Sequence, residues 1–182
     1  MRFQVMIATV MSGLSNHEAG IASHLLAVIA CAVAWTKSSW KSRVTATVGF
    51  FELLLLFDAV FHWRWELHGL LVRTAMELTV YSKRTLPQEV LSALFVSATL
   101  AAAVAMIPYA SKSPGACLAF CGGLISAVLW ALQVISLHAI DVVFERIVGP
   151  MSIVAWAWFG SSALVILGVL WIAVPSSAKH RA

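Results

Sequence analysis

The residue in this sequence best placed to do chemistry is Glu52, a carboxylic acid near the middle of the apolar run 44–62. Asp58 follows it by about one and a half turns if the run is helical. An ionisable side chain inside a membrane span costs about 2.5–3.5 kcal/mol on insertion scales, and such residues commonly mark ion or proton sites. Glu52 is therefore the candidate intramembrane titratable group.

A polar stripe extends from Glu52 along the following residues. Projected as one helix at about 100° per residue, seven ionisable residues fall within an arc of about 120°. Neighbours four apart on such a face can pair. The stripe predicts either salt bridges that fix helix packing or a ligand or proton site, while Arg64 and His68 project elsewhere. Its members are Glu52, Asp58, His62, Glu66, Arg73, Glu77 and Arg84.

A second group of polar residues lies at the end of the apolar run 116–140. His138, Asp141 and Glu145 are spaced i, i+3, i+7 and share an arc of about 60° on a helix. An imidazole and a carboxylate on one helix face resemble the ligand spacing of metal sites in helical bundles. The alternative is a solvated helix end, with an ion pair to Arg146.

Helix direction brings the two groups together. If five runs cross the membrane, the second and the fourth run in the same direction, and their ends emerge where the first run begins. Five of the six histidines then collect at one membrane surface, and His180 lies at the other. The five are His17, His24, His62, His68 and His138.

Such a cluster predicts a transition-metal or haem site. Imidazole suits copper, zinc and iron, and carboxylates shift the preference toward harder ions. The candidate metal ligands are Asp58, His62, Glu66, His68, His138, Asp141 and Glu145. For a b-type haem, the candidate axial pair is His24 with His62 or His138. For each histidine, a hydrogen-bonded interface residue is the competing interpretation.

Composition sets the environment in which these residues act. Of 182 residues, 61% are hydrophobic and 11% are charged, and the mean hydropathy is +0.91. Soluble domains carry about 25% charged residues, so much of this surface must face lipid. The net charge of +4 is spread over the ends of the apolar runs, as membrane loops require. No basic patch exists for nucleic acid.

The sequence predicts an all-α, polytopic membrane bundle in one domain, 1–182. A span needs about 20 residues, and five runs qualify, or four if the short first run does not cross. Residues 1–14 are expected to form a short interfacial segment. The stretch 63–84 is expected to be an amphipathic helix, which either continues the second span or bends near Gly69. The predicted spans are 20–36, 44–62, 90–109, 116–140 and 151–174.

Three functions remain open at this level. The first is a metal- or haem-binding subunit that serves redox chemistry or metal handling. The second is a non-catalytic accessory or assembly subunit, whose partners are other membrane subunits and the lipid bilayer. The third is a small proton-coupled transporter that uses Glu52. We expect the bacterial inner membrane as its location. The sequence contains no P-loop, GxSxG, HExxH or CxxCH motif, and whether the protein is an enzyme is left open.

Overall fold

The computed structural model confirms the predicted all-α class. It describes residues 15–37, 43–78, 85–110, 113–135 and 138–174, so the predicted segment 1–14 and the end of the predicted helix 63–84 lie outside it. The elements are α2 (Asn16–Lys37), α3 (Arg43–Phe61), α4 (Trp63–Glu77), α5 (Thr85–Ala110), α6 (Pro114–Ile135), α7 (His138–Phe144), β1 (Ile147–Val148), β2 (Met151–Ser152) and α8 (Ile153–Ala173).

Five of the helices are long and apolar enough to cross a membrane, which identifies an integral membrane protein. They are α2, α3, α5, α6 and α8. The first run, which looked short, forms a helix of 22 residues. The predicted span 116–140 corresponds to α6, but α6 ends at Ile135 and the separate helix α7 begins at His138. His138 and Asp141 therefore do not continue the fourth span.

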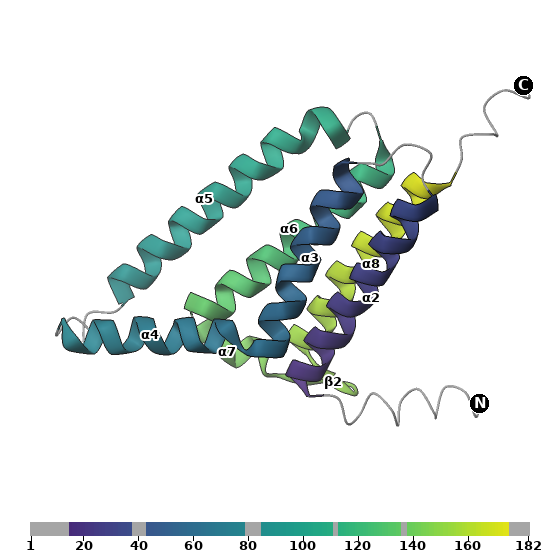
Figure 1. The fold of residues 1–182 in the computed structure, drawn as a ribbon. Coiled ribbons are helices and arrows are strands. Elements are labelled where there is room, and N and C mark those ends of the chain that lie inside the picture. Colours follow the sequence, from purple (N-terminus) through teal and green to yellow (C-terminus); the bar gives the residue numbers. More distant parts are fainter. Residues whose placement is uncertain (1–14, 38–42, 79–84, 111–112, 136–137, 175–182) are drawn as a thin grey trace, which may run out of the picture.

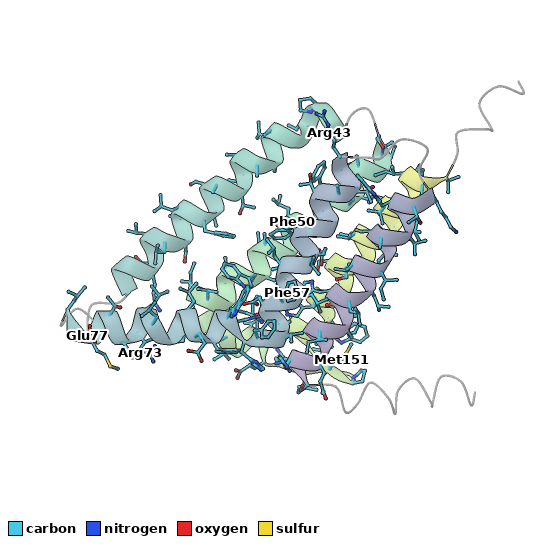
Figure 2. All side chains as sticks on the ribbon, in the orientation of Figure 1. Arg43, Phe50, Phe57, Arg73, Glu77 and Met151 are labelled. Carbon is cyan, nitrogen blue, oxygen red and sulfur yellow. The ribbon has the colours of Figure 1, made fainter. Side chains whose placement is uncertain are left out.

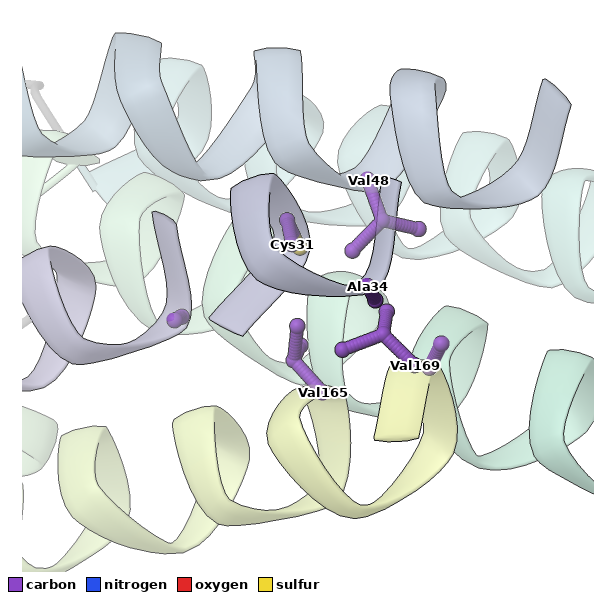
Figure 3. Packing of buried hydrophobic residues seen from close by; sticks show 7 residues of the cluster. Cys31, Ala34, Val48, Val165 and Val169 are labelled. Atoms are coloured by element: carbon purple, nitrogen blue, oxygen red, sulfur yellow. The ribbon is translucent and has the colours of Figure 1, made fainter. Parts of the chain in front are cut away.

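Four of these helices form a bundle, and the fifth, α5, contacts α6 but diverges from the bundle and has no buried residue in its described span (Figure 1). Helix α8 packs against both α2 and α6, and α3 packs against α2 and α6. The largest apolar cluster lies in the half of the bundle where α2 ends and α3 begins, and it joins residues of α2, α3, α6 and α8 (Figure 3). Its members are Ala27, Cys31, Ala34, Val48, Ala119, Val165 and Val169. Two smaller clusters, around Met151 and Trp158, lie toward the other end.

Helices α6 and α8 approach each other closely because glycines line their contact. A Cβ atom at Gly122 would lie 2.5 Å from the carbonyl oxygen of Ser161, and one at Gly168 would meet the backbone of Ala119. Small residues allow such approach where lipid provides no hydrophobic drive between helices. This seam fixes the spacing of the two helices that carry part of the site described below.

The chain bends sharply between α3 and α4. The bend lies at His62, which has φ 61° and ψ 28°, and not near Gly69, which is inside α4. Helix α4 then crosses the end of the bundle, and α5 returns along the membrane direction (Figure 1). The predicted stripe from Glu52 to Arg84 assumed one continuous helix, so its two halves do not share a face.

A short hairpin connects α7 to α8 at the same end of the bundle. Strands β1 and β2 pair antiparallel, and Gly149 in the turn has φ 65°, a conformation that glycine adopts at little cost. Ser152 then caps α8, because its hydroxyl accepts a hydrogen bond from the backbone N–H of Ala155 at 3.2 Å.

Candidate functional site

The centre of the site is an imidazole–carboxylate pair inside the bundle. Nδ1 of His24 on α2 lies 2.7 Å from Oε2 of Glu52 on α3. Both side chains are completely buried. An isolated charge is very unfavourable in such surroundings, and a hydrogen-bonded partner of opposite charge offsets much of that cost. Glu52, predicted from its position alone, thus has a partner that the sequence did not reveal.

Hydroxyl groups from the other two bundle helices complete the surroundings of Glu52. The hydroxyl of Ser126 on α6 lies 3.4 Å from Oε1 of Glu52 and 3.0 Å from the hydroxyl of Ser161 on α8. Ser161 in turn donates to the carbonyl oxygen of Trp158 at 2.9 Å. All four helices of the bundle therefore meet at this carboxylate.

The imidazole of His24 also contacts an aromatic ring. Its Nε2 is buried and has no hydrogen-bond partner among the residues that the structure describes. The imidazole meets the indole of Trp158 edge-on, with 4.9 Å between ring centroids and 70° between ring planes. Buried polar atoms are hydrogen-bonded in the large majority of cases, and among the described residues Nε1 of Trp130 and the hydroxyl of Ser162 are the other buried side-chain atoms without such a bond.

A second ion pair lies between this centre and the end of the bundle. The backbone N–H and the Nε of Arg64 each donate to an oxygen of Asp58 at 2.7 Å. Nη1 of Arg64 also donates to the side chain of Gln133, and the guanidinium lies over Trp158, 5.4 Å from the ring centroid. Burial lowers the pKa of Arg64 and Asp58 opposes that effect; an arginine stays charged under both influences.

A polar cavity of about 330 Å³ opens beside this pair, where α2 begins and α3 ends. His17 and His62 stack across it, with ring centroids 4.3 Å apart. An adjoining cavity of about 230 Å³ shares Asn16, Trp65 and Gln133 with the first. The lining residues that carry charge or a titratable group are His17, Asp58, His62 and Arg64 in the first cavity, and Asp141 and Glu145 in the second.

The predicted site residues are distributed over three places. Asp58, His62, Asp141 and Glu145 line the adjoining cavities, whereas His24 lies deeper, in the bundle. His68 donates from Nδ1 to the carbonyl oxygen of Val134 at 3.1 Å, and Glu66 is exposed. Arg73 and Glu77 lie toward the far end of α4, away from the bundle (Figure 2).

Metal or haem ligation finds no ready-made ligand set in the described part of the chain. No group of three His, Cys, Asp or Glu side chains there is arranged to hold a metal ion. For haem, His24 is enclosed by Glu52 and Trp158, and His62 is stacked on His17. The side chain of His138 lies outside what the structure describes.

Several residues of the site were missed in the sequence. Arg64 projects away from Asp58 on a straight helix, so only the bend at His62 brings the two together. Three further site residues are polar side chains within strongly apolar runs, and this position weakly indicates a buried polar contact. They are Gln133, Ser126 and Ser161. Nothing in the sequence indicated that Trp158 would contact both His24 and Arg64.

Comparison with known proteins adds no family to this description. No protein-family model, no curated protein and no solved structure matches the chain significantly. Function has to be argued from the site itself.

Proposed function

We propose that this protein is a small proton-coupled membrane carrier and that the His24–Glu52 pair binds the coupling proton. The observation that carries the proposal is the 2.7 Å contact between two completely buried titratable groups on adjacent spans. A buried ion pair is a poor way to stabilise a protein, since apolar residues of similar volume often do as well or better. Ionisable groups at this depth are functional candidates for the same reason.

The charge states of the pair explain how it would couple proton release to a conformational change or to the arrival of a compensating charged group. With one proton between them, the imidazole and the carboxylate are together neutral or form an internal ion pair. Loss of that proton leaves an uncompensated carboxylate in the bundle, which is strongly unfavourable unless water or a cation replaces the charge. Proton release therefore requires a conformational change or the arrival of a compensating group.

The pair is completely buried in this conformation, and its polar surroundings lie toward one end of the bundle only. The polar cavity and the Asp58–Arg64 pair lie toward the end where α2 begins. On the other side, the apolar cluster that includes Ala27, Cys31 and Val165 fills the bundle (Figure 3). A carrier must expose its site alternately, and this arrangement corresponds to a state occluded from that second side.

Infrared difference spectroscopy tests the proposal without knowledge of the substrate. The purified protein in lipid nanodiscs is titrated with acid, and the C=O band of a protonated carboxyl group is followed. We expect a reversible band that disappears in Glu52→Gln and persists in Glu66→Gln, a matched control at an exposed glutamate. If neither Glu52 nor the imidazole of His24 shows a pH-dependent band at any pH in the folded wild-type protein, the pair is a fixed structural link and the proposal fails.

A second candidate function, an accessory subunit of a larger membrane complex, is favoured by α5. None of the described window Gln88–Ala105 is buried, compared with 33–44% of the other four spans. Native mass spectrometry of protein extracted from its own membrane with a mild detergent tests this. A defined complex that is lost on Ala101→Trp and kept on Phe50→Trp, a bulky substitution on the exposed face of α3, would support it; a free monomer in both would exclude it.

The helical architecture also bears on the membrane in which the protein resides. Helical bundles of this kind suit a plasma or inner membrane, because outer-membrane proteins of bacteria are β-barrels. We therefore propose the bacterial inner membrane, with the bilayer itself as the constant partner of α4 and α5.

A further inference from the structure

One indole connects the two ion pairs of the site. Trp158 is 1% exposed. The imidazole of His24 meets it at 4.9 Å and the guanidinium of Arg64 lies over it at 5.4 Å. The indole of Trp158 thus contacts the imidazole of His24 on one hand and the guanidinium of Arg64 on the other, and Arg64 in turn lines the polar cavity.

We propose that Trp158 and Arg64 form a gate that controls proton access to His24 from the 330 Å³ cavity. The gate is closed in this structure, because Arg64 is held on the indole by Asp58 and Gln133. This inference rests on the proposed function, since a gate has meaning only if the His24–Glu52 pair exchanges protons. Trp158 is here a positioning residue, because it acts by keeping proton donors in the cavity away from the imidazole of His24.

Of the two gate residues, Arg64 is the one that can move, because of how α4 is attached to the bundle. Within α4, whose 15 residues are all described, Arg64 is the only buried residue. The helix packs mainly against α3 and α6, its Arg64 also contacts Trp158 on α8, and it follows directly on His62. A left-handed backbone conformation is uncommon outside glycine and is found at switch regions. Relaxation of His62 would swing α4 outward and withdraw Arg64 from Trp158.

Electrostatic repulsion couples the position of Arg64 to the protonation state of His24. A protonated His24 and Arg64 are two cations at one aromatic ring, and like charges at this separation repel in a low-dielectric interior. Protonation of His24 therefore weakens the hold of Arg64 on the indole, and loss of Arg64 favours protonation of His24 by the same coupling. The other polar groups near the pair are the thiol of Cys31 on α2 and the hydroxyls of Ser126 on α6 and Ser161 on α8, and none of them is a basic or carboxyl group.

Deuterium exchange into the buried pair tests the gate. The carboxyl band of Glu52 is followed by infrared after rapid transfer of the nanodisc-embedded protein into D₂O. In Trp158→Leu and in the double variant Asp58→Asn/Arg64→Gln, which leaves no unpaired charge, we expect exchange at least about tenfold faster than in the wild type. Trp158→Phe keeps an aromatic face and should restore slow exchange. Trp156→Leu, at an exposed indole on the same helix, is the matched control.

The outcomes separate the gate from the function on which it rests. If neither Glu52 nor His24 shows a pH-dependent infrared band in the folded wild type, the proposed function fails before the gate is reached. If the band exists but its exchange rate is unchanged in both gate variants, with helical content retained by circular dichroism, the gate is wrong and the proton site stands. Faster exchange in Trp158→Leu without rescue by Trp158→Phe would also overturn it, because loss of packing alone would then explain the change.

Discussion

The four-helix bundle and the arm formed by α4 and α5 differ in how much of each helix is buried against the rest of the protein. In the bundle, between 33 and 44% of each span is buried, and the polar side chains point inward to one another. In the arm, no residue of the described span of α5 is buried, and α4 buries Arg64 alone. The bundle therefore encloses the His24–Glu52 pair, and the arm contributes one buried cation, Arg64, at the end of the bundle.

The largest effect should come from the seam that holds the bundle together. Gly122→Leu places a side chain against the backbone of α8, which cannot move aside, and we expect a loss of about 3 kcal/mol or more in stability. Thermal unfolding in detergent, followed by circular dichroism, measures it. Gly160→Leu is the matched control, because no atom lies within 4 Å of a Cβ there. Equal destabilisation by both would show that α6 and α8 are not in this close contact.

A smaller effect is expected where the arm meets the bundle. Asp58→Ala leaves the guanidinium of Arg64 partly buried without its carboxylate, and we expect a loss of about 2–3 kcal/mol, less than for a pair remote from any cavity. Adding Arg64→Met should recover most of it, since the unpaired charge is removed. The same unfolding assay measures both variants, and a double variant no more stable than Asp58→Ala would argue against the ion pair.

The smallest effect is expected on the arm itself. Leu94 on α5 is 63% exposed, so Leu94→Ala should change the stability of the bundle by less than about 0.5 kcal/mol. Leu129→Ala, at a buried leucine of α6, is the contrasting substitution and should cost about 2–5 kcal/mol. Should Leu94→Ala cost as much as Leu129→Ala, α5 packs against the bundle more closely than described.

The sequence predicted what depends on composition and missed what depends on register. Hydropathy alone located the five spans, and a carboxylate within a span marked Glu52. Its partner His24 was expected nearer the membrane surface, as a haem ligand, because nothing local shows which residue of α2 lies opposite Glu52. That pairing follows from how α2 and α3 are aligned across the loop between them.

The bend at His62 shows the second limit of sequence reasoning. Gly69 carried the usual signal for a bend, yet the chain turns at a histidine held by the bonds of Arg64 to Asp58. A helical projection assumes that backbone geometry continues, so it placed Arg64 on the wrong side. The predicted direction of the helices was more accurate. Helices α3 and α6 end on the same side of the bundle (Figure 1), and Asp58 and Asp141 line adjoining cavities there.

The most direct test of the central claim is the protonation state of His24, read from the ¹⁵N chemical shifts of its imidazole by solid-state NMR in lipid bilayers. The account predicts that both ring nitrogens of His24 change shift reversibly with pH while the protein stays folded, and that Glu52→Gln alters this response. A single, unchanging set of His24 shifts across the whole pH range of the folded protein would contradict it.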